Sequence, residues 1–163
     1  MTLSNPLKPI PIAPEWSSPW HHMVAMLRKV EYIKIESLSA CETGTFVIEI
    51  FEATSTNRIP TNRSRSRDRS TAVVARVERE CTEFNALRTQ VYIVVHNAHA
   101  ESPCEFCKSV MDVVILGDRG PARRFVQRLV ALIKHNGDVA GCSGQIQVAQ
   151  VLYAFLFQQH VGD

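Results

Sequence analysis

The chain has 163 residues, of which 45% are hydrophobic and 21% are charged, and its formal net charge is +2. This length and composition are typical of one globular domain of ordinary size with a short tail. A net charge so close to zero gives no indication of a nucleic-acid or membrane partner, and no apolar run approaches the roughly 20 residues that span a membrane.

Residues 1 to about 27 are predicted to form an unstructured, proline-rich tail, because five of the eight prolines lie here and proline disfavours regular helix and sheet. Lys8, Pro11 and Pro14 have the K-x-x-P-x-x-P spacing of a polyproline ligand, so the tail is a candidate for binding a protein partner. This spacing also arises easily in any proline-rich leader. The start of the chain lacks a signal-peptide pattern, and the odd number of cysteines, five, predicts reduced thiols in an intracellular protein.

The segments that follow have the composition of β-strands. Residues 30–38 and 45–53 are rich in Val, Ile, Phe and Tyr, and the turn signal at Gly44 between them predicts an antiparallel hairpin. Residues 71–79 alternate apolar and charged side chains, which predicts a third strand. A three-stranded sheet with one apolar face requires a covering layer.

A basic loop is predicted between the second and third strands, at residues 54–70. Five arginines against one aspartate give residues 57–70 a net charge of +4, so the remainder of the chain carries −2. Four interpretations stay open: attraction to anionic lipids, contact with RNA, phosphorylation of the serines, and plain solubility, which is the commonest. The residues of this loop that matter are Arg58, Arg63, Arg65, Arg67 and Arg69, with Ser64, Ser66 and Ser70.

A helical pattern begins directly after the third strand. Thr82 is predicted to be the N-cap of a helix that runs to about His99. Three further helical segments follow at residues 104–116, 122–135 and 145–157, separated by glycine and proline. Three strands followed by three to four helices predict an α+β fold, in which the helices stack on a small antiparallel β-meander.

The stretch RECTEFNALR, residues 79–88, resembles the hallmark of the phox homology (PX) domain. That family has a three-stranded antiparallel sheet followed by a helical subdomain. Its hallmark is an Arg-Arg-Tyr-Ser-Glu/Asp-Phe stretch at the end of the third strand, and residues 79–84 fall on these six positions. The resemblance covers about residues 30–157 and implies a PX-like domain at residues 28–160.

PX domains bind phosphoinositide headgroups at intracellular membranes, often those of endosomes. The resemblance therefore implies a cytoplasmic module that associates peripherally with such membranes, with no nucleic-acid partner and no required cofactor. The chain has no recognisable catalytic motif, so we do not expect an enzyme. Guanidinium groups suit phosphate because they bind it bidentately. The candidate headgroup-binding residues are Arg79, Arg123, Arg124 and Lys108.

The sequence departs from the PX hallmark at the positions that recognise the headgroup. Glu80 stands where the family has its phosphate-holding arginine, and Cys81 stands where it has the ring-packing tyrosine. A carboxylate about 4 Å from a phosphate charge would oppose binding by roughly 4 kcal/mol at an effective dielectric of ~20. Because fold does not determine function, the alternative prediction is a degenerate PX fold that acts in protein–protein interaction without specific lipid binding.

A second group of residues has the types that bind zinc. His96, His99, Cys104 and Cys107 have the spacing H-x2-H-x4-C-x2-C, and two imidazoles with two thiolates form a standard tetrahedral zinc set. Cys142 is an alternative fourth ligand. Two other interpretations stay open, since buried cysteines often pack as small hydrophobes and histidines suit a helix C-terminus. A thioredoxin-like role of the two neighbouring cysteines is less favoured, because the chain has no βαβ pattern.

Overall fold

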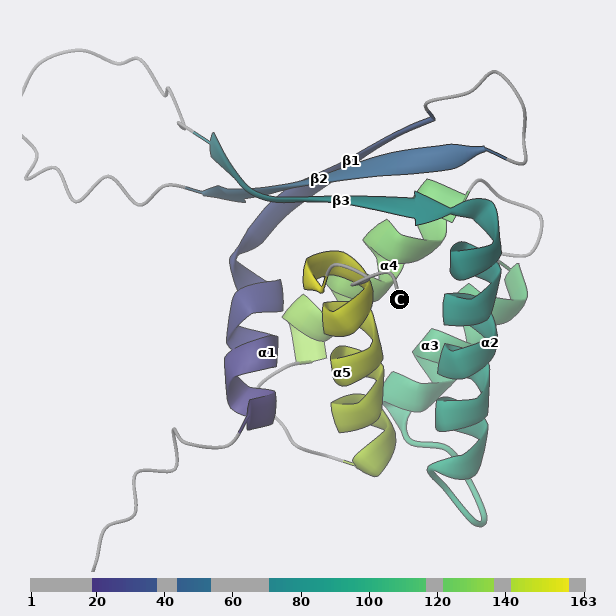
Figure 1. Ribbon diagram of the computed structural model, residues 1–163. Coiled ribbons are helices and arrows are strands. Elements are labelled where there is room, and N and C mark those ends of the chain that lie inside the picture. Colours follow the sequence, from purple (N-terminus) through teal and green to yellow (C-terminus); the bar gives the residue numbers. More distant parts are fainter. Residues whose placement is uncertain (1–18, 38–43, 54–70, 117–121, 137–141, 159–163) are drawn as a thin grey trace, which may run out of the picture.

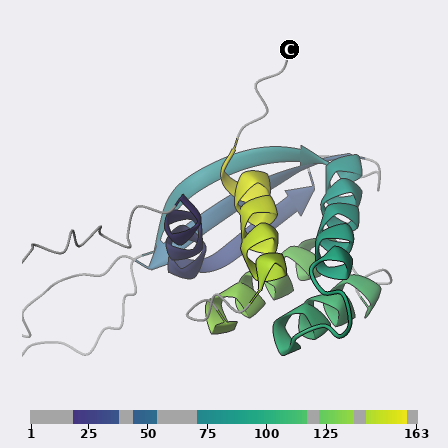
Figure 2. The same cartoon turned by 90° about the horizontal axis from the view of Figure 1, so that it is seen from below.

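The structure is a computed structural model that describes residues 19–37, 44–53, 71–116, 122–136 and 142–158. It is α+β, as the sequence predicts: one antiparallel sheet in the order β1-β2-β3 is combined with five described helices. These helices lie on one side of the sheet (Figures 1 and 2). The elements in chain order are α1 (Pro19–Lys29), β1 (Val30–Ser37), β2 (Thr45–Ala53), β3 (Thr71–Glu80), α2 (Cys81–Asn97), α3 (Glu105–Leu116), α4 (Ala122–Asn136) and α5 (Ser143–Phe157).

The two faces of the sheet differ in the way that the alternating sequence predicts. Ile48 of β2 lies opposite Val77 of β3, and both side chains are buried against the helices. On the outer face Glu49 lies between two cations, with Lys34 Nζ at 3.9 Å and Arg76 Nη1 at 4.0 Å. The period-2 alternation of a strand therefore separates a hydrophobic face from a charged one.

One hydrophobic core connects the sheet with the helices. Side chains from every described helix and strand belong to a single buried cluster. Burial of each large aliphatic side chain contributes about 1.5–3 kcal/mol relative to exposure. The core therefore holds the five described helices together against one face of the sheet. Fully buried examples from these helices and from β2 are Leu27, Ile48, Val91, Leu129 and Leu152.

The edge strand β1 is supported by side chains of α4. Gln127 Nε2 donates a hydrogen bond of 3.1 Å to the carbonyl oxygen of Ile33, and Lys134 Nζ donates one of 2.6 Å to that of Val30. An edge strand presents backbone groups that need partners. These two bonds satisfy carbonyls of β1 and fix α4 against it.

The prediction of an unstructured tail is wrong from Pro19 onward, because Pro19–Lys29 forms helix α1. Val24 and Leu27 of this helix are buried, and α1 packs against α4 and α5. Proline is well tolerated in the first turn of a helix, where no backbone donor is required. Pro19 is therefore compatible with the start of α1. The polyproline spacing in residues 8–14 lies outside the described residues, as does the basic loop at residues 54–70.

Helix α2 begins one residue after the end of β3, earlier than predicted. Its N-cap is Glu80, not Thr82, and the Glu83 carboxylate accepts a hydrogen bond of 2.6 Å from the Glu80 backbone N–H. This is the reach-back bond of a capping box. The strand therefore passes into the helix without a loop, which fixes the direction of Arg79, the residue just before the cap.

Candidate metal centre

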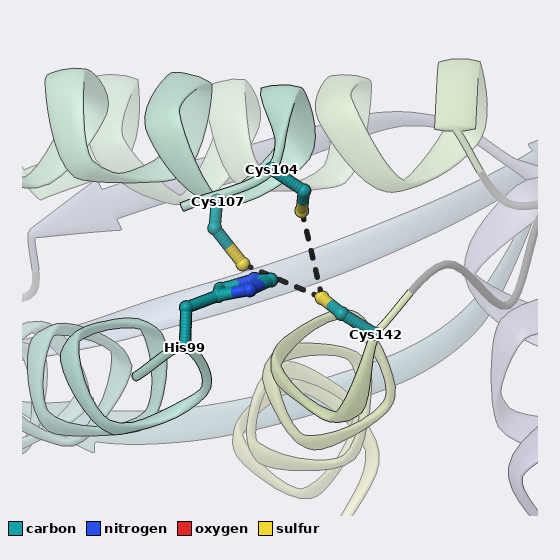
Figure 3. Close-up of side chains that lie close together, drawn as sticks. All are labelled: His99, Cys104, Cys107 and Cys142. Carbon is teal, nitrogen blue, oxygen red and sulfur yellow. Dashed lines mark hydrogen bonds between the residues drawn. The ribbon is translucent and has the colours of Figure 1, made fainter. Parts of the chain in front are cut away.

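Four side chains with metal-binding groups meet where three helix ends come together. His99 follows the C-terminal end of α2, Cys104 immediately precedes α3, Cys107 lies in the first turn of α3, and Cys142 is the N-cap of α5. One ligand atom from each residue lies within 4.8 Å of the other three. In Figure 3 the three thiols and the imidazole point toward one another.

The distances between the sulfur atoms fit a tetrahedral metal site. Cys142 Sγ lies 3.6 Å from Cys104 Sγ and 3.5 Å from Cys107 Sγ. A tetrahedral zinc ion with Zn–S bonds of about 2.3 Å would hold its sulfurs about 3.8 Å apart. The cluster therefore needs to expand by a few tenths of an ångström to bind zinc, which side-chain rotation can supply.

The imidazole of His99 contributes a buried nitrogen. Its Nε2 atom is inaccessible to solvent and has no hydrogen-bond partner in the described part of the structure. A buried polar group without a partner costs about 1–3 kcal/mol. Coordination of a metal through this nitrogen would remove that cost.

The backbone at the start of α5 places a hydrogen-bond donor beside the sulfur of Cys142. The Gln145 backbone N–H lies 3.4 Å from Cys142 Sγ and donates a hydrogen bond to it, and Cys142 caps the positive N-terminal end of α5. Cys104 stands at the corresponding end of α3. The backbone N–H groups at a helix N-terminus interact favourably with negative charge, such as that of a thiolate bound to a metal.

The thiols of Cys104 and Cys107 have opposite pKa shifts. Burial raises the pKa of Cys104, but hydrogen bonding from the Cys107 backbone and contacts with the Cys142, Cys107 and His99 side chains outweigh it and lower the pKa to about 7. The pKa of Cys107 is raised, first by burial and then by the Cys142 and Cys104 thiols. Because metal binding requires thiolates, a divalent cation would have to displace the proton that Cys107 retains.

Gly144 is a part of this site that the sequence did not single out. A Cβ atom on Gly144 would lie 2.7 Å from Ala98 Cβ and 2.9 Å from Cys107 Sγ. The first turn of α5 thus approaches the end of α2 and the cluster more closely than any side chain would permit. The feature of the sequence that could have identified Gly144 is its position two residues after Cys142, a candidate ligand.

Of the four predicted ligands, His99, Cys104 and Cys107 lie in the cluster and His96 does not. His96 is exposed in the last turn of α2, and its Nδ1 atom lies 3.4 Å from Asn97 Oδ1. Because α2 ends at Asn97, the chain turns before His99, and the two histidines do not share a helix face. Cys142, considered above as an alternative, takes the fourth position.

Arg79, the first candidate for headgroup binding, is engaged by the protein itself. It is 3% exposed, its Nε donates a 2.9 Å hydrogen bond to the carbonyl of Phe155, and its Nη2 donates to that of Gln158. Its Nη1 also lies 3.7 Å from a carboxylate oxygen of Glu83. A cation here satisfies the carbonyls at the C-terminal end of α5 and interacts favourably with the helix dipole.

The other headgroup candidates lie on different elements. Lys108 is exposed on α3, where its Nζ lies 2.9 Å from the Glu105 carboxylate. Arg124 is exposed on α4, and the side chain of its neighbour Arg123 lies outside the described structure. A pocket of about 520 Å³ between α2 and α5 includes Arg79 but neither Lys108 nor Arg124. The described candidates therefore do not line one common cleft beside Arg79.

Comparison of the chain with family models, with curated proteins and with solved structures found no match. The PX resemblance therefore stays a prediction from the residues around the strand-to-helix junction. Among the described residues, no helix combines the length and the apolar character needed to cross a membrane.

Proposed function

We propose that this chain is a zinc-binding domain, in which one Zn²⁺ ion joins the ends of α2, α3 and α5. Three cysteines and one histidine form a common set of ligands in structural zinc sites, where four protein ligands leave no open position for a substrate. The proposed role of the metal is therefore to stabilise the fold and not to catalyse a reaction. The ligands are His99, Cys104, Cys107 and Cys142.

The observation that carries this proposal is the convergence of the three thiols on a half-buried imidazole whose Nε2 atom is inaccessible to solvent. Packing of cysteines as small hydrophobes accounts for the burial of Cys107. It does not account for the buried Nε2 atom of His99, which has no hydrogen-bond partner in the described structure. A metal ion explains both features, because it binds thiolates and the imidazole lone pair at one point.

The experiment is a metal analysis of the full chain purified without chelator. We expect one zinc ion per chain in the unmodified protein, and loss of zinc in Cys104→Ser, Cys142→Ser and His99→Ala. The matched controls are His96→Ala and Cys81→Ser, which change the same residue types outside the cluster and should retain zinc. A zinc content far below one per chain, with a Tm that a chelator does not change, would contradict the proposal.

The second candidate function concerns the resemblance to PX domains. Of its two forms, phosphoinositide binding and protein interaction without specific lipid binding, we favour the second. What supports it is the engagement of Arg79 with the carbonyls of α5, together with the exposed Glu80 at the position of the phosphate-holding arginine. Lipid binding would have to depend on other arginines.

Co-sedimentation with liposomes tests this choice. We expect no preference of the unmodified chain for phosphoinositide vesicles over phosphatidylserine vesicles, and a gain of selective binding when Glu80→Arg is combined with Cys81→Tyr. Glu78→Arg, two residues earlier and exposed on the same strand, introduces the same change of charge and controls for nonspecific attraction. Selective, tight binding by the unmodified chain would overturn the choice in favour of headgroup recognition.

A further inference from the structure

The three thiols of the metal cluster differ in their access to solvent. Cys107 is 0% exposed, whereas Cys104 and Cys142 are each partly exposed. The sulfur atoms of these two partly exposed residues lie 3.6 Å apart, and they belong to segments 38 positions apart in the sequence. A small oxidant arriving from solvent therefore reaches these two residues more readily than it reaches Cys107.

We propose that the cluster is a redox-controlled zinc site, in which hydrogen peroxide converts Cys104 and Cys142 into a disulfide and the zinc is released. This inference rests on the proposed function, because a site that binds no zinc has none to release. Their sulfur atoms lie 3.6 Å apart, so they must approach by roughly 1.6 Å to form an S–S bond of about 2.05 Å. Oxidation by peroxide requires access to the sulfur, and both residues of this pair are partly exposed.

The reaction balances with one molecule of peroxide. One thiolate of the pair attacks a peroxide oxygen, the O–O bond breaks, and the sulfur becomes a sulfenic acid while hydroxide leaves. The second thiolate attacks the sulfenic sulfur, forms the S–S bond and expels a second hydroxide. Two sulfurs have then lost two electrons, the peroxide is reduced to two molecules of water, and solvent supplies two protons.

Disulfide formation removes two of the four ligands and changes which helix ends are joined. Cys107 and His99 remain, and two ligands do not make a tetrahedral zinc site. The new bond still joins the start of α3 to the start of α5, as the metal does in the reduced state. The C-terminal end of α2, which is attached to the site through His99, is released. In the reduced state the metal links the ends of α2, α3 and α5, whereas after oxidation the disulfide links only α3 and α5.

The test uses the zinc-loaded full chain treated with hydrogen peroxide, with a chromogenic chelator that reports free zinc. Combined digestion after glutamate and after lysine or arginine separates the cysteines, with Cys104 in residues 102–105, Cys107 in 106–108 and Cys142 in 135–163. We expect a crosslink between the first and third of these peptides and release of one zinc per linked chain. Dithiothreitol followed by added zinc should restore the original metal content.

Cys81 supplies the matched control thiol, since it is partly exposed and lies outside the cluster. Cys81→Ser should release zinc as the unmodified chain does. Retention of zinc at a peroxide dose that oxidises Cys81 would overturn the inference, as would a crosslink that contains residues 106–108. A chain that contains no zinc before treatment contradicts the proposed function itself, whereas a zinc-loaded chain that keeps its metal contradicts the redox inference alone.

Discussion

At the scale of single residues, the cluster depends on a glycine that binds nothing. Gly144 allows the first turn of α5 to pass beside Ala98 and the Cys107 sulfur, where an added Cβ would lie at 2.7 and 2.9 Å. The first of these contacts is with a Cβ atom, which has no rotamer by which to move away. Any larger residue therefore has to displace α5 from the end of α2.

We expect Gly144→Ala to lower the zinc content and to destabilise the fold by about 1–3 kcal/mol, the range of overpacking in well-packed sites. Denaturant unfolding and metal analysis measure the two effects. Gln147→Ala, at an exposed position of the same helix, is the control and should change neither. Unchanged zinc content and stability in Gly144→Ala would show that the close approach is not required.

The thiol of Cys104 provides a pH-dependent test of the site after removal of metal. Its pKa of about 7, against the ordinary value of 9.0, means that half of the thiol is ionised near neutral pH. Alkylation by iodoacetamide requires the thiolate, so the rate at Cys104 should rise with pH and reach half its maximum near pH 7. Cys107 should react slowest, because it is fully buried and its pKa is raised.

The same shift gives the sign of a contribution to stability in the metal-free chain. The folded-state pKa of Cys104 lies below the ordinary value, so its thiolate stabilises the folded state above about pH 9 and this stabilisation is lost as the pH falls through 7. Peptide mapping of protein alkylated at a series of pH values measures the pKa of Cys104, on which both expectations depend. A midpoint near pH 9 at Cys104 would show that the neighbouring groups do not favour its thiolate.

At the scale of the elements, Arg79 connects the end of β3 with the end of α5. We expect Arg79→Gln to destabilise the chain by about 2–4 kcal/mol, because the carbonyls that Arg79 binds would lose a buried charged donor. Arg76→Gln is the matched control on the same strand, since Arg76 is exposed and an exposed substitution changes stability by about 0.5 kcal/mol or less.

Chemical denaturation of the two variants measures the difference between them. The resemblance of residues 79–84 to the PX hallmark predicts that Arg79→Gln loses lipid binding, whereas the burial of Arg79 predicts that it loses stability. Equal stabilities of Arg79→Gln and Arg76→Gln would contradict the structural role of Arg79.

The elements themselves could largely be predicted from local patterns. The strands alternate with period two, and the helices repeat apolar residues at helical spacing, so α3, α4 and α5 begin within two residues of their predicted starts. Helix α1 was missed because its apolar face is short and follows a run of prolines. The N-cap of α2 was missed because Thr82 is a common cap, while Glu80 is selected here by its bond with Glu83.

At the scale of the whole molecule, the candidate site could be predicted only in part, because its ligands come from separate segments. Local spacing identified His99, Cys104 and Cys107, which lie between the end of α2 and the first turn of α3. Cys142 is 35 positions beyond Cys107, and its place depends on how α5 packs against α2 and α3. The Arg79 side chain points toward α5 because of the same packing, so its orientation cannot be predicted from residue spacing.

Interactions at both ends of the antiparallel helix pair α2 and α5 stabilise its packing. Near the sheet, Arg79 binds the carbonyls at the end of α5. Away from the sheet, where the end of α2 lies beside the start of α5 (Figure 1), the proposed zinc ion would join these two ends through His99 and Cys142. The Arg79 hydrogen bonds and the proposed metal coordination share no residues, and they act on opposite ends of the same antiparallel pair. Loss of one should therefore loosen one end of the pair and leave the other end protected.

Hydrogen exchange on the zinc-loaded and chelator-treated chains tests this arrangement. Removal of zinc should increase exchange in the last turns of α2, at the start of α3 and in the first turns of α5, while the sheet and the end of α5 keep their protection. Arg79→Gln with zinc bound is the matched control, and it should increase exchange in the last turn of α5 instead. If chelation increased exchange equally across the sheet and all helices, the metal would act on the global stability of the fold and not on one end of the α2–α5 pair.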